Sequence, residues 1–232
     1  MHHPLRVPLH VSGRAKSYAQ VYFLMCAQAM VRYRSLLTRL PDPAAGAVEY
    51  EHVLTDVEHA SIEAVVFAGM CLEATLFDLA ACLLGDEFAD SIDKLDPLGK
   101  FFVIAQYVDR ASPDRSSVTV QHLQSVVQSR SRLVHHKSQS AENLETEIGK
   151  VMERAKREHD QHVRGVEAAF KSLVLLSLHF DGNIFEELRI LPSFKKPEFW
   201  QEVVPTYLHE EVRWCIEVSR KEAQRRGQRS DA

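Results

Sequence analysis

The residues best suited to chemistry in this sequence are Arg130 and His135. The surrounding stretch is typical of a helix with an apolar stripe at the three-and-four spacing of a buried face, formed by Val120, Leu123, Val127 and Val134. Arg130 stands where this stripe should continue, and arginine cannot lose its charge to ease burial. Histidine transfers protons readily near neutral pH. A fixed cation close to an imidazole is the minimum needed to act on a phosphodiester without a metal ion.

Two questions about this pair stay open at the level of sequence. The helix could turn so that Arg130 simply reaches solvent. In addition, residues five apart on an ideal helix point about 140° away from each other. The two side chains therefore converge only if the helix bends, or if the length of Arg130 or a second subunit makes up the difference. Arg132 and His136 are expected on the outer face, although both could supplement the site.

The elements that must position the pair are all predicted to be helices, because no convincing strand pattern occurs. The helix with Arg130 should begin at a cap on Ser116 or Ser117 and end near Lys137. The segment 62–84 is apolar almost all round, so it should be a central buried helix that ends at Gly85. The other expected helices are 14–40, 48–84 (which contains the buried segment), 90–108 with a break at Pro97, 141–180 and 198–226.

These elements divide into three parts. Residues 1–47 supply an N-terminal helix and linker, 48–182 a bundle of long antiparallel helices, and 183–232 a helical extension. The aromatic residues of the extension, among them Trp200, Tyr207 and Trp214, indicate that it packs on the bundle. Residues 220–232 are expected to be a frayed, solvated helix end.

Two carboxylates of the central helix need an explanation. Glu73 and Asp78 lie about 140° apart on a helical wheel, so they cannot share one narrow strip of solvent. At least one of them should press against the interior, where a carboxylate needs a cationic partner.

Composition favours a soluble, cytoplasmic protein. The chain has 232 residues, 45% of them hydrophobic, and a net charge of −4, so any contact with RNA must be local. The four cysteines are scattered, as in a reduced protein. Residues 17–31 are the best membrane candidate but are too short to span a bilayer. No cofactor or metal is expected. The two histidines in 158–162 have a spacing that can bind a metal, but their segment is charged on every side, so a solvated helix face is expected instead.

The sequence Arg130-Ser131-Arg132-Leu133-Val134-His135 resembles the signature of the HEPN superfamily, which has an arginine, four to six residues and a histidine. Two earlier segments resemble the family in the right order. Residues 69–80 are similar to its glutamate-bearing apolar helix, and residues 91–101 to the connecting segment of one bacterial group. The resemblance covers roughly residues 50–180.

This resemblance implies a HEPN-like helical bundle and a metal-independent endoribonuclease that forms a homodimer, with RNA as its substrate. His135 would be the acid or base and Arg130 would stabilise the charged phosphate. Glu73 would orient Arg130, with Asp78 as the alternative, and Ser131 stands where the family commonly has asparagine. His136 and Lys137 would support the site. The expected role is that of a toxin or antiviral effector.

A second interpretation belongs to a different class. The chain could be a non-catalytic HEPN-like module for dimerisation and for binding a partner such as an antitoxin or another defence protein. The negative net charge, Ser131 and the lack of an obvious basic stripe favour this alternative.

Overall fold

The described part of the chain folds into helices, which confirms the predicted all-α class. A computed structural model describes residues 17–40, 47–109, 112–135, 144–180 and 190–230. Its helices are α1 (Ala19–Leu37), α2 (Ala47–Leu84), α3 (Asp86–Ile92), α4 (Pro97–Asp109), α5 (Val118–Val134), α6 (Leu144–Phe180), α8 (Pro197–Trp200), the 3-10 helix η1 (Thr206–Leu208) and α9 (His209–Ser230).

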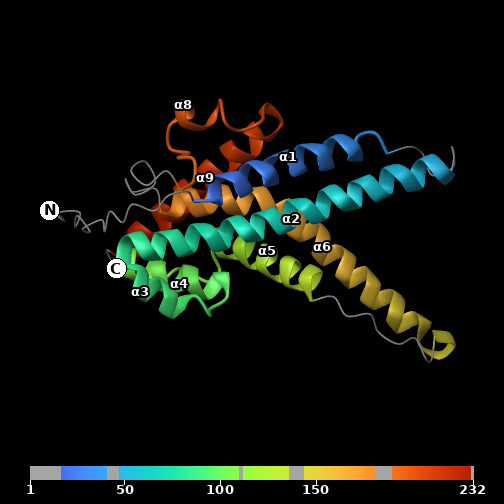
Figure 1. The fold of residues 1–232 in the computed structure, drawn as a ribbon, viewed down its shortest axis with the longest axis horizontal. Coiled ribbons are helices and arrows are strands. Elements are labelled where there is room, and N and C mark those ends of the chain that lie inside the picture. Colours follow the sequence, from blue (N-terminus) through green and yellow to red (C-terminus); the bar gives the residue numbers. More distant parts are fainter. Residues whose placement is uncertain (1–16, 41–46, 110–111, 136–143, 181–189, 231–232) are drawn as a thin grey trace.

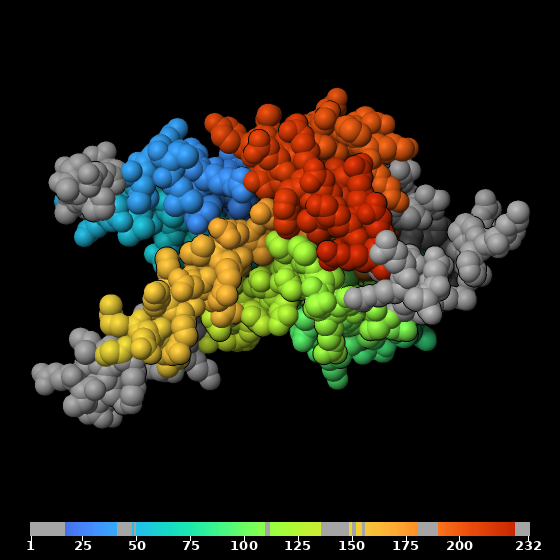
Figure 2. All heavy atoms as spheres, turned by 180° about the vertical axis from the view of Figure 1, so that it is seen from behind, coloured from blue at the N-terminus to red at the C-terminus, as the bar shows by residue number. Residues whose placement is uncertain are grey.

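Two antiparallel helical pairs form the centre of the structure. Figure 1 shows α1 running back along α2, and α5 running back along α6. The short helices α3 and α4 lie at the C-terminal end of α2. The C-terminal elements cover another side, and the view from behind in Figure 2 shows them against α6 and α5. The bundle therefore surrounds α2.

Helix α2 is the central buried helix, as its apolar sequence predicts. No residue from Ala60 to Leu84 is exposed, because α1, α4, α5 and α6 all contact this helix. Gly85 ends it with a φ of 93° and a ψ of 161°, a conformation that side chains with a Cβ rarely adopt. The predicted stop at Gly85 is therefore confirmed.

Side chains cap the starts of α4 and α5. The Asp96 side chain accepts a hydrogen bond of 2.8 Å from the Gly99 amide, and Pro97 occupies the first position of α4. The predicted break at Pro97 is thus confirmed, although α3 begins at Asp86, earlier than expected. Ser117 caps α5 by accepting a hydrogen bond from the Val120 amide.

The C-terminal part differs from the single helix expected over 198–226. It contains α8, then a turn over residues 201–205 that ends at Pro205, and then η1, which continues directly into α9. Proline lacks the amide hydrogen that a continuous helix needs at this point. Helix α9 continues to Ser230, so it does not end near residue 220, and residues 220–225 are mostly exposed, as expected of a solvated helix end.

One apolar core joins the N-terminal, central and C-terminal parts of the chain. Phe23 on α1 is fully buried, with its ring 5.6 Å from that of Phe170 on α6 and 6.0 Å from that of Phe194. Trp200 is also buried, whereas Tyr207 is largely exposed. The C-terminal extension therefore completes the core, although only some of its aromatic residues take part.

Within the described residues, the helix that meets the length and apolarity of a membrane span is Tyr50–Leu84 within α2, and not residues 17–31. In its most apolar window, 61% is already buried against the rest of the protein. A central helix of a water-soluble bundle has the same character, so this finding is weak support for a membrane span.

Helix α9 is held on α5 and α6 by a small polar and aromatic cluster. The His122 ring lies 5.4 Å from the Trp214 ring, and Lys171 Nζ lies 4.7 Å from the same Trp214 ring. Glu222 accepts hydrogen bonds from the Thr119 amide and hydroxyl at the start of α5. The His122 Nδ1–H donates to the Val118 carbonyl at 2.9 Å.

Burial lowers the pKa of His122, and the nearby Lys171 ammonium lowers it further. The Val118 carbonyl and the Glu222 and Glu167 carboxylates oppose this shift without overcoming it. The folded protein thus binds a proton at His122 less readily than the unfolded chain.

We expect acid to destabilise the protein through this histidine. Because its pKa is lower in the folded state, the free energy of unfolding should decrease as the pH falls below about 6.5, until the folded-state pKa is passed. Urea unfolding of wild type and His122→Asn between about pH 7.5 and about pH 5 would measure this loss. The asparagine keeps a donor towards Val118, so its stability should fall less than that of wild type. Equal slopes would contradict the prediction.

Candidate active site

The centre of the site is an ion pair between α5 and α2. Arg130 Nη1 donates to Glu73 Oε1 at 2.6 Å, with 28% of the arginine side chain and 39% of the glutamate side chain exposed. Arg130 therefore neither enters the apolar core nor turns fully to solvent. The expected contact between Glu73 and Arg130 is confirmed. It pairs the carboxylate of α2 with the guanidinium of α5 where the two helices cross.

Gly69 on α2 makes room for Arg130, because glycine has no side chain. A Cβ atom placed on Gly69 would overlap Cδ of Arg130 and lie 3.1 Å from its Nε. The Arg130 Nε is buried and has no hydrogen-bond partner among the described residues. The stem of Arg130 thus lies flat on the α2 backbone at Gly69, and its guanidinium reaches Glu73 one turn further along α2.

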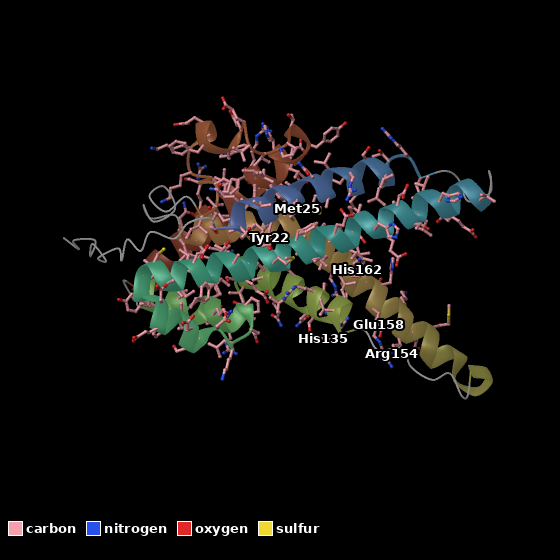
Figure 3. The ribbon with its side chains drawn as sticks, viewed as in Figure 1. Tyr22, Met25, His135, Arg154, Glu158 and His162 are labelled. Atoms are coloured by element: carbon pink, nitrogen blue, oxygen red, sulfur yellow. The ribbon has the colours of Figure 1, made fainter. Side chains whose placement is uncertain are left out.

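His135 lies where α5 ends, as Figure 3 shows. It is the C-cap residue, with a φ of −109° and a ψ of 21°, and its amide donates to the Ser131 carbonyl at 3.0 Å. His135 thus keeps its helical position four residues after Ser131, and the angle of about 140° from Arg130 is spanned by one broad face of α5. The His135 side chain is exposed, and it lines the same cleft as Arg130.

The cleft has a volume of about 850 Å³ and is bounded by α1, α2, α5 and the turn between α3 and α4. Asp78 and Ser131 also line it, so both carboxylates of α2 that the sequence singles out reach one cavity. Arg132 is exposed and is not among the cleft residues, which agrees with its expected place on the outer face. His136 and Lys137 lie outside the described residues.

The cleft does not carry an excess of positive charge among its described residues. Lys100, which is buried, lies 2.5 Å from the Asp93 carboxylate, and Asp96 is occupied in capping α4. The basic side chains that line the cleft are Lys94, Lys100 and Arg130, and the acidic ones are Glu73, Asp78, Asp93 and Asp96. A phosphate would therefore meet a wall of nearly balanced charge, in which Arg130 and Lys100 are each already paired with a carboxylate.

Tyr18, Tyr22 and Lys100 are among the cleft residues that sequence reasoning missed. The tyrosines are four residues apart, and such a spacing places both on one face of a helix. This spacing alone does not indicate a binding site, because aromatic pairs are common in helix packing. The Lys100 contact joins residues seven apart across a helix break, which no helical spacing predicts.

The histidines in 158–162 lie on α6, away from the cleft-lining residues. Figure 3 shows Arg154, Glu158 and His162 following one another along this helix. His162 is half-buried and lies 2.7 Å from the Ser61 hydroxyl, so the expectation of a fully solvated segment is wrong at this position. Burial lowers the pKa of His162, as does its neighbour His159. Over the described ranges, no group of three histidine, cysteine, aspartate or glutamate side chains is arranged to hold a metal ion.

We expect Gly69→Ala to disturb Arg130 specifically. The added methyl group overlaps the arginine stem, and overpacking of this kind costs about 1–3 kcal/mol of unfolding free energy. Urea unfolding would measure this loss in wild type and in an Arg130→Ala background, where the clash is removed and the loss should vanish. Gly149→Ala on α6 is the matched control, since a Cβ there meets nothing within 4 Å. It should stabilise the protein by about 0.5–1 kcal/mol through helix propensity. An equal loss in both backgrounds would show that Gly69 does not act through Arg130.

No protein-family model, curated protein or solved structure matches the chain. The similarity to the HEPN signature therefore stays a prediction from the sequence.

Proposed function

We propose that this protein is a metal-independent endoribonuclease and that the cleft between α2 and α5 is its active site. The observation that carries the proposal is the placement of Arg130 and His135 on one cleft, with Arg130 held by Glu73. These are the two residues of the HEPN-like motif, and Glu73 belongs to the segment that resembles the family's glutamate-bearing helix.

In this chemistry the ribose 2′-OH is the nucleophile. A neutral His135 imidazole would accept its proton while the bond between the 2′ oxygen and phosphorus forms. The bond from phosphorus to the 5′ oxygen then breaks, and this oxygen takes a proton from an acid or from water. The products are a 2′,3′-cyclic phosphate and a 5′-OH. Arg130 would bind the non-bridging oxygens, whose negative charge grows in the transition state.

The partly exposed guanidinium suits this role. Glu73 accepts from one of the five N–H donors of Arg130, which fixes the direction of the side chain. The exposed remainder faces a cleft large enough for nucleotide-sized ligands. A homodimer, which the resemblance implies, would bring a second copy of the motif to the substrate. A toxin or antiviral effector is the role that fits such an activity.

The balanced charge of the cleft favours a second candidate function. Nucleic-acid affinity depends strongly on cations that contact phosphates, and Arg130 is the main candidate for such a contact among the described residues of the cleft. A non-catalytic module would use the same cleft to bind a partner protein, such as an antitoxin or another defence component. RNA cleavage separates the two functions.

We expect purified wild type to cleave single-stranded RNA in the presence of a chelator and to leave cyclic-phosphate ends. His135→Ala should lower the rate by about 10²–10⁴-fold, and Arg130→Ala by about 10²–10³-fold. Electrophoresis of end-labelled RNA measures both.

The matched controls for this assay are Arg132→Ala, on the same helix but off the cleft, and His159→Ala, an exposed histidine on α6. Both should retain the wild-type rate. Intact RNA with a folded wild-type protein would contradict the nuclease and favour the binding module. Equal losses in the controls would instead contradict the placement of the active site at Arg130 and His135.

We further expect Glu73 to act by positioning Arg130. Glu73→Gln keeps an acceptor but removes the charge that holds the guanidinium, so the cleavage rate should fall by about ten- to a hundredfold. Asp78→Asn is the comparison, because Asp78 lines the cleft as well and was the alternative partner. A greater loss of cleavage rate for Asp78→Asn than for Glu73→Gln would show that Asp78, and not Glu73, positions Arg130. Matching thermal unfolding curves would show that each variant keeps its fold.

A further inference from the structure

One wall of the cleft carries a stack of aromatic rings that the proposed chemistry does not use. Tyr18 and Tyr22 both line the cleft. Their ring centroids lie 6.1 Å apart with the planes inclined by 30°. Tyr22 is in turn 6.5 Å from Phe67 on α2, at an angle of 16°. The three rings form a nearly parallel series from α2 to the rim of the cleft.

Burial along this series is uneven. Phe67 and Tyr22 are partly buried and pack against the core, so helix packing accounts for them. Tyr18 is 59% exposed, although it lies at the start of α1 and continues the stack. Its ring direction is thus fixed from one side by Tyr22, while much of its surface remains accessible. A ring held in this way is suited to stack on another flat group.

Tyr18 lines the same cleft as the proposed catalytic residues Arg130 and His135. Tyr18 and Tyr22 come from α1, whereas Arg130 and His135 come from α5, and all four line one cleft of about 850 Å³. A nucleotide whose phosphate meets Arg130 would have its base available to the aromatic wall. The balanced charge of the cleft makes such a contact more important, because the described cations provide little attraction beyond Arg130.

We propose that Tyr18 is a stacking platform for the base of an unpaired nucleotide, so that the cleft selects single-stranded RNA over duplex RNA. This inference rests on the proposed ribonuclease function. An aromatic side chain can stack on an unpaired base, whereas bases inside a duplex already stack on their neighbours. Stacking tolerates all four bases, so Tyr18 contributes affinity for single strands more than a preference for one sequence.

The test is RNA binding by a protein that cannot cleave. In a His135→Ala background, a short single-stranded RNA that carries the fluorescent base 2-aminopurine is titrated with protein. Stacking on an aromatic ring quenches this base, so the signal reports the contact itself. The variants are Tyr18→Ala, Tyr18→Phe and, as a matched control, Tyr107→Ala, an exposed tyrosine of α4 off the cleft. The same strand annealed to its complement serves as the duplex probe.

We expect Tyr18→Ala to weaken single-strand binding by about 5- to 100-fold and to lose the quenching. Tyr18→Phe keeps the ring and should bind as the parent does, as should Tyr107→Ala. The duplex should bind more weakly than the single strand and without quenching. Unchanged binding in Tyr18→Ala, or equal binding of single strand and duplex, overturns the proposal, as does a failure of the parent to bind any RNA.

The outcomes also separate this inference from the proposed nuclease. Cleavage by wild type together with unchanged binding in Tyr18→Ala would retain the nuclease and remove the stacking platform. Tyr18-dependent quenching by a protein whose wild type leaves RNA intact would retain the platform and remove the nuclease.

Discussion

The structure depends on the burial of α2, a helix that offers no fully exposed residue over its C-terminal 25 positions, 60–84. Three of these residues are acidic, and a carboxylate at the edge of an apolar interior needs a cation nearby. Arg32 on α1 pairs with Glu63, and Arg130 on α5 pairs with Glu73. The neighbouring helices thus supply charge as well as apolar surface. The placement of Arg130 follows from this requirement, independently of any catalysis.

Much of this arrangement could be predicted from the sequence, because the decisive signals are local. The apolar run of α2, its stop at Gly85, the break before Pro97 and the cap at Ser117 each depend on a few adjacent residues. The pairing of Glu73 with Arg130 could also be predicted, since a buried carboxylate and a core-facing arginine each lack another partner. The single helix expected over 198–226 is wrong because Pro205 lacks the amide hydrogen that a continuous helix needs there.

The cleft itself could not be predicted in the same way. Its walls come from four separate parts of the chain, and the contact between Tyr18 and the rest of the site depends on how α1 lies on α2. Arg130 and His135 border one cleft because a broad face of α5 lines it, with Ser131 and Val134 between them, whereas a helical wheel gives only the angle between the two residues. Close approach of the helices matters too. At Gly165 on α6 a Cβ would overlap Ser129, just as one at Gly69 would overlap Arg130. One glycine on each side, Gly69 on α2 and Gly165 on α6, therefore allows the neighbouring helix to approach α5 closely.

The aromatic contact that joins Phe23 to Phe194 and Phe170 has a consequence for the order of events during translation. The ribosome delivers Phe23 long before Phe194. Until the segment around 190–215 emerges, the apolar surface that Ile190, Phe194, Trp200 and Val212 cover has no partner. Domains generally fold as units during synthesis, and here the unit is incomplete until that segment has left the ribosome. A nascent chain would thus acquire its finished core, and the fixed position of α1 along the cleft, only after residues 190–215 have emerged.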